Sequence, residues 1–289
     1  MIGPIRCVTV TVPDLGHAVQ TYRRYLGYEP FHDERLPPDQ ADYLGAPALA
    51  GADSTLLRPA SGGDFCFRFI SQSLPPGYRP LTTWGWNAAE LIVEDVDGLA
   101  AELEDSPFRI VGPPEDLSFS EAIRAMQVIG PAEEVLYLTM VKEALPEFDL
   151  PRPSCPVDRT FIVILGGTDM AAMQGFYRTG FGVPAAPVME ARISVLSQAL
   201  QLPADTLHPI AAMPLAGQSL IEVDDYPAAT TPRDCPPGGL PPAIAMVSFA
   251  VDALPGDLPA AHFAAPPYHG RGCALTTGAA GERVELIRT

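Results

Sequence analysis

The sequence is poor in histidine, in positive charge and in long apolar runs. It holds five His, and its 18 Lys and Arg stand against 35 Asp and Glu, which gives a net charge of −17. Because nucleic acids and anionic membrane surfaces bind clustered positive charge, both are poor partners for this chain. No apolar run approaches the ~18 residues of a membrane span, and no signal-peptide pattern opens the sequence. We therefore expect a cytoplasmic protein with neither nucleic-acid nor membrane partners.

Cysteine is also scarce, and its pattern is uninformative for chemistry. The five cysteines are odd in number and contain no CxxC pair, which argues against a disulfide framework or a structural zinc site. Apolar residues make up 47% of the 289 residues, enough to bury a core. This length fits one large domain or two ordinary ones.

Four segments repeat one pattern, in which a strand is followed by an Asp and then by an apolar residue that opens a helix. Their aspartates are Asp14, Asp95, Asp169 and Asp252. Alternate members are 155 (169 − 14) and 157 (252 − 95) residues apart, which indicates a duplicated module inside a duplicated domain. Each Asp stands where a helix N-cap belongs, so its carboxylate can accept backbone N–H groups of the first turn. We assign these aspartates a structural role.

Apolar residues at helical spacing follow the first three aspartates. Gly27 and Gly182 stop two of these helices, as glycines at helix C-termini do, whereas Pro255 and Pro259 shorten or break the fourth. Strand-like runs come after each helix, so the unit is β-α-β-β with room for a further strand. Residues 144–156, rich in proline and acidic residues, are the expected linker.

The repeated strings resemble a known superfamily. VTVTVPDLGHAVQTYRRYLGYEP and FIVILGGTDMAAMQGFYRTGFGVP resemble the opening strand and helix of vicinal-oxygen-chelate modules, found in glyoxalases, bleomycin-resistance proteins and extradiol dioxygenases. LIVEDVDGLAAEL resembles a second-module opening, and GRGCALTTGAAGERVELI resembles closing strands. The resemblance covers nearly the whole chain. It implies an α+β fold of four βαβββ modules, paired into two cup-shaped mixed-sheet domains.

The same resemblance implies a division of labour between the halves. Residues 1–146 would form a structural N-terminal domain of two modules. Residues 157–289 would form a C-terminal domain whose cup binds the ligand.

In this family the metal ligands come from opening and closing strands. The matching opening positions hold no His; they are Cys7, Ala88, Ile162 and Met246. The matching closing positions are Arg68, Tyr137, Glu222 and Glu285. Non-heme iron needs imidazole and carboxylate ligands, whereas two carboxylates suit Mg²⁺ or Mn²⁺ weakly. No cofactor is firmly expected, and a divalent metal (Mn, Fe, Mg or Zn), if bound, would be held by Glu222 and Glu285.

Two carboxylates carry the expected chemistry. Glu222 and Glu285 occupy matching strand positions and are expected to point into the same cup. In an apolar cavity they would repel each other, so at least one pKa would rise and suit acid/base catalysis. The alternative is that Arg283, Arg192 or Arg271 holds each carboxylate inert.

Further site candidates surround this pair. His208 and His269 are the histidines with a case for catalysis, although each fits a non-catalytic role as well. In the N-terminal half, Glu90 shares strand parity with a lost ligand position. The expected substrate contacts are Ile162, Met246, Ser248, Tyr268 and Arg271.

Three functions remain open. The first is a lyase or isomerase that acts on a small apolar or aromatic carbonyl compound by carboxylate acid/base chemistry. The second is a non-catalytic small-molecule binding protein of the bleomycin-resistance type. The third is a ring-cleaving dioxygenase with relocated ligands, such as His208 or His269 with Glu285. A small-molecule ligand is the expected partner, and both a monomer and a homodimer fit.

Overall fold

The computed structural model describes residues 2–117, 120–145 and 149–289. The first module comprises β1 (Ile5–Val12), α1 (Leu15–Leu26), β2 (Glu29–Arg35), α2 (Pro38–Tyr43), a 3₁₀ turn η1 (Pro47–Leu49), β3 (Asp53–Arg58) and β4 (Cys66–Ser71). The second comprises β5 (Gly85–Val93), α3 (Val96–Leu103), β6 (Arg109–Leu117), β7 (Ser120–Ile129) and β8 (Val135–Val141). The third comprises β9 (Val157–Gly167), α4 (Met170–Phe181), β10 (Met189–Arg192), α5 (Ser194–Ala199), β11 (Leu207–Leu215) and β12 (Ser219–Asp225). The fourth comprises β13 (Ala243–Val251), β14 (Ala261–His262), β15 (Gly272–Thr277) and β16 (Arg283–Arg288). The α+β fold of four repeated modules is confirmed.

Helix ends form where the repeats predicted them. The Asp14 carboxylate accepts from the backbone N–H of His17 at 2.9 Å, and Asp169 accepts from Ala172 at 2.8 Å. Gly27 takes a left-handed conformation with φ 66°, which glycine adopts without steric cost. No described residue between β13 and β14 is helical, so the fourth helix is lost, as its prolines predicted.

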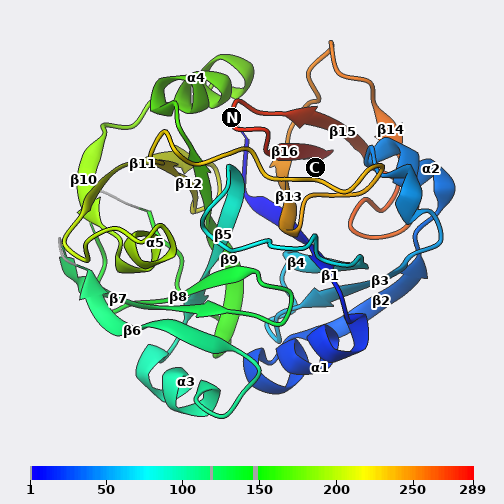
Figure 1. The fold of residues 1–289 in the computed structure, drawn as a ribbon. Helices are drawn as coiled ribbons and strands as arrows, with labels where there is room; N and C mark the ends of the chain where they lie inside the picture. Colours follow the sequence, from blue (N-terminus) through cyan, green and yellow to red (C-terminus); the bar gives the residue numbers. More distant parts are fainter. Residues whose placement is uncertain (1, 118–119, 146–148) are drawn as a thin grey trace.

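The modules pair into two eight-stranded sheets (Figure 1), but the partners differ from those expected. One sheet runs β14-β15-β16-β13-β1-β4-β3-β2 and the other β10-β11-β12-β9-β5-β8-β7-β6. The first module therefore joins the fourth, through antiparallel β1 and β13, and the second joins the third, through β5 and β9. The expectation of one cup within each half is wrong, because all four opening strands are apolar and the repeat does not show which two of them pair. Independent folding of 1–146 and 157–289 stays a prediction.

Alternate residues of each opening strand serve different surfaces. On β1, Val8 and Val10 join the main core with Tyr22 of α1, whereas Thr9 faces the inside of the curled sheet and bonds Arg68. This alternation follows the two-residue period of a strand. Helices α1, α3 and α4 therefore pack on the outer faces of the sheets with the main core, and the inner faces form two cups.

The two cups are filled differently. The cup of the first and fourth modules is called here the closed cup. Residues of α2, η1 and the loop before β15 fill it. Tyr43, Phe263 and Tyr268 stack there with ring centroids 5.0 to 6.4 Å apart. The cup of the second and third modules, called here the open cup, is filled only at one end, where Val195 and Leu196 of α5 join a buried cluster.

Two features lie outside the sheets. The expected linker includes residues 146–148, which lie outside the described residues, and residues 149–156 form neither helix nor strand. In the described part of the chain, none of the helices has the length and apolar character needed to cross a membrane.

Candidate active site

The two glutamates expected to share a cup lie apart. Glu222 is on β12 and faces the open cup, whereas Glu285 is on β16 in the sheet of the closed cup. Strand parity identified two inward-facing carboxylates, but their modules belong to different sheets. The shared cup was therefore wrong, for the same reason that the pairing of modules was wrong.

In the closed cup, Glu285 is part of a buried polar network. Its carboxylate accepts hydrogen bonds from the hydroxyls of Ser248 and Tyr268, the latter at 2.8 Å. The Arg68 guanidinium lies 3.6 Å away, donates to the Tyr268 hydroxyl at 2.7 Å, and donates twice to Thr9 at 3.0 and 3.1 Å. Arg68 and Glu285 have no exposed surface. Arginine thus stands at one closing position and glutamate at the other, and their charges neutralise each other.

The polar side chains of this network are buried in the closed cup. Ser248, Tyr268 and Met246, three expected substrate contacts, are fully buried. Ser248 and Tyr268 donate hydrogen bonds to Glu285. Met246 packs in the apolar cluster that includes residues of α2 and η1. The geometry favours a structural role for Glu285 over the expected catalytic or metal-binding one.

The two candidate histidines are not brought to Glu285. His208 on β11 is buried in the other sheet, where its Nε2 lies 2.8 Å from the Ser197 hydroxyl, and burial lowers the pKa of its imidazole. His269 is exposed, with a φ of 51°, and lines a small pocket at the rim of the closed cup. The relocated ligand set of His208 with Glu285 is excluded by this separation.

The three arginines expected to pair with Glu222 and Glu285 form no ion pair with them among the described residues. Arg283 donates to the carbonyl of Leu44, and Arg271 donates to the carbonyl of Tyr268 at 3.1 Å. Arg192 lines the open cup. The partner that holds Glu285 is instead Arg68.

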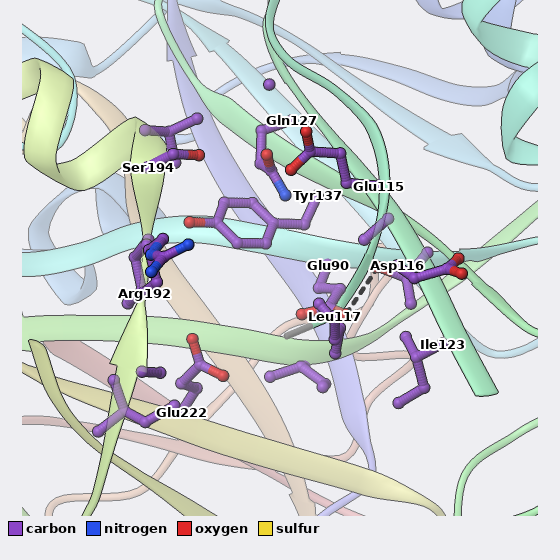
Figure 2. A pocket seen from close by; sticks show the side chains of 18 of the residues that line it. Glu90, Glu115, Asp116, Leu117, Ile123, Gln127, Tyr137, Arg192, Ser194 and Glu222 are labelled. Atoms are coloured by element: carbon purple, nitrogen blue, oxygen red, sulfur yellow. Dashed lines mark hydrogen bonds between the residues drawn. The ribbon is translucent and has the colours of Figure 1, made fainter. Parts of the chain in front are cut away.

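The open cup contains a cavity of about 680 Å³ with a largely apolar wall. Ile162, an expected substrate contact, lies in this wall together with Phe161 and Ile210. Figure 2 shows polar side chains around the space, among them those of Glu90, Gln127, Tyr137, Arg192 and Glu222. A concave, apolar site with a few polar groups is the usual form of a small-molecule site.

Four acidic side chains line this cavity. Glu115 and Asp116 are exposed, whereas Glu90 of β5 is one of the two that lie in its interior. Its side chain is mostly buried, and the Thr139 hydroxyl donates to Oε1 at 2.7 Å. Burial, followed by repulsion from Glu222, raises the pKa of Glu90 to about 8. A carboxyl with this pKa holds its proton for much of the time at neutral pH.

Glu222 of β12 is the second acidic group. Burial raises its pKa to about 7, and no hydrogen bond from a described residue opposes that rise. Strand β9 lies between β5 and β12, with Glu90 paired to Ile162 and Glu222 paired to Ile164, so the two carboxyls stand on either side of β9 and both line the cavity. The two carboxyls can therefore contact one small ligand from two sides.

Further polar groups lie next to this pair. Tyr137 stands opposite Glu90 in the register of β5 and β8, and burial raises the pKa of its phenol well above the usual value. Behind Glu222 on the same strand face, Asp224 is buried, and its Oδ1 and the Tyr226 hydroxyl have no hydrogen-bond partner among described residues. Burial raises the pKa of Asp224 as well, so this end of the cup favours protonated groups.

The family's metal does not fit the residues of the open cup. The opening positions there are Ala88 and Ile162 and the closing position beside Glu90 is Tyr137, so Glu222 alone remains of four ligand positions. Within residues 2–117, 120–145 and 149–289, no three His, Cys, Asp or Glu side chains converge as a metal site would require.

The sequence had marked Glu90 by its strand parity but could not give it a partner. Glu90 and Glu222 come from different halves of the chain and meet only because β5 and β9 pair. Gln127 carried no signal, because nothing in its local sequence shows that it faces a cavity, and Arg192 was expected only as a partner that would hold a carboxylate.

Comparison with known proteins bears on the fold. No protein-family model matches the chain, and no curated protein sequence matches it. Among solved structures, glyoxalase I from Zea mays matches with a TM-score of 0.62 at 16% identity, covering 98% of this chain and 92% of that one. A single-residue mutant of that maize enzyme gives 0.63 at 15% identity, covering 98% and 93%. A proposed dioxygenase from Bacillus subtilis gives 0.62 at 9% identity, covering 98% and 84%.

These matches extend over nearly the whole chain and over most of each relative, so all four modules are shared. At such identities they establish the fold and leave the chemistry open. The chain therefore has the four-module vicinal-oxygen-chelate fold that its sequence resembles.

Proposed function

We propose that the open cup is the active site of a lyase or isomerase that acts on a small, largely apolar or aromatic carbonyl compound. The observation that carries this proposal is the presence of two carboxyls, Glu90 and Glu222, in one largely apolar cavity of about 680 Å³, with pKa values raised to about 8 and about 7. General acid and base groups work best when their pKa values lie near the working pH.

The different environments of the two carboxyls give one of them the role of base and the other the role of acid. Near neutral pH the group with the lower pKa, Glu222, is the one that ionises first and acts as the base. Glu90 keeps its proton and acts as the acid. Because the two repel each other, the two titration steps belong to the pair. Loss of one proton leaves one base and one acid in the same cavity.

Tyr137 and Arg192 complete the chemistry. Glu222 removes a proton from the carbon next to the substrate carbonyl, and the electron pair of that C–H bond moves toward the carbonyl oxygen. The Tyr137 hydroxyl, kept protonated by burial, donates a hydrogen bond to the oxygen as its charge grows. Arg192 is the one Lys or Arg among the residues of the cavity wall, and it attracts the same charge. Glu90 then donates its proton, to a carbon of the resulting enolate in an isomerase or to the group that leaves the neighbouring carbon in a lyase.

The test measures carbon–hydrogen exchange, which can be followed without identifying the final product. The protein is incubated in D₂O with a panel of small aliphatic and aromatic ketones, aldehydes and 2-oxo acids, and deuterium uptake next to the carbonyl is followed by NMR. We expect uptake in at least one compound, reduced ~10²–10⁴-fold in Glu222→Gln, as is typical when a general base is lost.

The matched control is Glu190→Gln. Glu190 is an exposed acid on β10 and does not line the cavity, so this variant should exchange deuterium at the wild-type rate. Full exchange in Glu222→Gln, or equal losses in both variants, would contradict the assignment of Glu222 as the base.

A second function is favoured by one observation. The opening positions Ala88 and Ile162 are apolar and are buried in the wall or floor of the open cup, so the cup can hold a flat apolar molecule by packing alone. A binding protein would bind members of the same panel tightly and return them without deuterium. That outcome would replace the enzyme proposal.

A further inference from the structure

A small pocket of about 210 Å³ opens at the rim of the closed cup, between β1, β3 and the loop that precedes β15. This rim pocket is lined by Arg6, Arg58 and Arg271, together with His269 and a single acid, Asp64. The chain as a whole is acidic, with 18 Lys and Arg against 35 Asp and Glu. The three arginines around this small pocket therefore give it a local charge opposite in sign to the net charge of the protein. The open cup shows the opposite balance, since one arginine faces several acids there.

We propose that the rim pocket binds a phosphate dianion, either inorganic phosphate or the phosphate group of a small phosphomonoester. The proposal is independent of the chemistry of the open cup, because the two sites lie in different sheets and share no residue.

The side of the pocket that carries Arg271 is fixed by the buried network. The Tyr268 hydroxyl is bonded to both Arg68 and Glu285, which anchors the loop in the interior. Arg271 Nε donates to the Tyr268 carbonyl at 3.1 Å, so one edge of the guanidinium is committed to the protein and its terminal N–H groups remain available. The backbone N–H of His269 is also held, by Ala265 O at 3.1 Å. The loop therefore presents its polar groups without having to order on binding.

The opposite side is held by packing and by one ion pair. The Arg58 guanidinium lies over the ring of Phe31, 5.2 Å from its centroid, which favours its position at the pocket. Arg6 bonds Asp64 at 2.8 Å with its side chain 20% exposed, whereas Asp64 is 81% exposed. Within the described chain, Arg6 is the one of the three arginines that forms an ion pair with a carboxylate. Arg58 and Arg271 thus bring uncompensated positive charge to the pocket.

Charge and geometry together select the ligand. Three arginines and one aspartate give the wall a net charge of +2 with His269 neutral, which a dianion neutralises and a monocarboxylate does not. The planar N–H fork of arginine matches the oxygens of a phosphate in a bidentate manner. Phe65, Pro266 and Pro267 form an apolar side of the same pocket, where the organic part of a small phosphomonoester would lie.

The test is titration calorimetry of inorganic phosphate and of glycerol phosphate into the full chain, with acetate as the monoanion for comparison. We expect saturable binding of both phosphates and none of acetate. Arg58→Gln and Arg271→Gln should each weaken phosphate binding about tenfold or more, because each removes a charge-assisted hydrogen bond.

Two further variants separate a built site from general attraction to positive charge. Arg35→Gln is the matched control, since Arg35 is an exposed arginine of β2 in the same sheet but outside the pocket, and its phosphate affinity should equal that of the wild type. Asp64→Asn should tighten binding several-fold, because it removes the competing anion from Arg6. Absence of saturable phosphate binding, an equal loss in Arg35→Gln, or weaker binding in Asp64→Asn would each overturn the proposal.

Discussion

Single residues at matching strand positions give the two cups their different character. In the closed cup, Arg68 and Glu285 lie 3.6 Å apart and their opposite charges neutralise each other. In the open cup, Tyr137 stands at the position of Arg68, and Glu222 forms no ion pair with any described residue. The sequence showed which residues occupy the closing positions. It did not show which of them face each other, because that depends on how the modules pair.

The buried pair in the closed cup yields a stability prediction. Arg68→Met should lower the free energy of unfolding by about 3–5 kcal/mol, because it leaves the Glu285 carboxylate buried without its cation. Urea denaturation measures this loss. Adding Glu285→Gln to Arg68→Met should restore much of the stability, since the neutral amide oxygen still accepts from one of the two hydroxyls and the amide NH₂ group can donate to the oxygen of the other.

An exposed pair provides the control. Arg23 and Glu29 form an ion pair with both side chains more than half exposed, so Arg23→Met should cost less than about 1 kcal/mol. A similar cost for Arg68→Met would show that the buried guanidinium contributes little.

At the scale of elements, the repeats were predicted correctly because caps and stops are local. Asp14, Asp95 and Asp169 all cap helices, and the capping depends on groups within three residues. The additional short elements α2, η1 and α5 were not predicted from the sequence. Each is at most six residues long, too short to show a helical period, and each is stabilised by packing inside a cup.

Two glycines at the end of α4 give a matched test of local conformation. Gly182 has a φ of 67°, whereas Gly180 is helical, and a Cβ added at either position would meet no atom within 4 Å. Gly182→Ala should therefore destabilise the protein by about 1 kcal/mol through backbone strain, and Gly180→Ala should stabilise it by about 0.4–1 kcal/mol. Thermal unfolding of the two variants checks the opposite signs.

At the scale of the whole molecule, each half of the chain has one buried hydrogen bond between its two modules, although each sheet combines modules from both halves. The Tyr22 hydroxyl of α1 donates to Glu134 at 2.8 Å, and the Tyr177 hydroxyl of α4 donates to Glu282 at 2.9 Å. Burial raises the pKa of both carboxyls to about 7 from 4.5. Between about pH 4.5 and pH 7, the folded protein thus holds protons on these two carboxyls that the unfolded chain releases.

The pH dependence of stability follows from these two carboxyls, together with Glu90 and Glu222. Because the pKa values of these four carboxyls are raised in the folded protein, what their protonated forms add to the free energy of unfolding is fully present below about pH 4.5. It is lost as the pH rises to about 7 or 8. Glu134 and Glu282 should each account for about 3 kcal/mol of this decline. Urea denaturation of the wild type between pH 5 and 8 should show the fall, and a flatter curve is expected for Glu134→Gln and Glu282→Gln. A curve that rises with pH would contradict the burial of neutral carboxyls.

The sequence by itself determined everything that depends on near neighbours or on repetition. The capping aspartates of the first three modules, the stop glycines, the four modules and their inward-facing closing residues are all encoded within one repeat, and they were predicted correctly. The cap expected at Asp252 was wrong, because no helix follows β13 among the described residues. A fold of two curled mixed sheets followed from the resemblance of these repeats to a known family.

Only the tertiary structure decided which modules share a cup. Apolar opening strands can pair with one another in more than one way, and the choice rests on contacts between residues far apart in the chain, such as Cys7 beside Ser248 and Glu90 beside Ile162. That choice joined Arg68 to Glu285 in one cup and left Glu90 and Glu222 together in the other. The candidate active site is therefore a property of long-range strand pairing, whereas the modules that form it are a property of the local sequence.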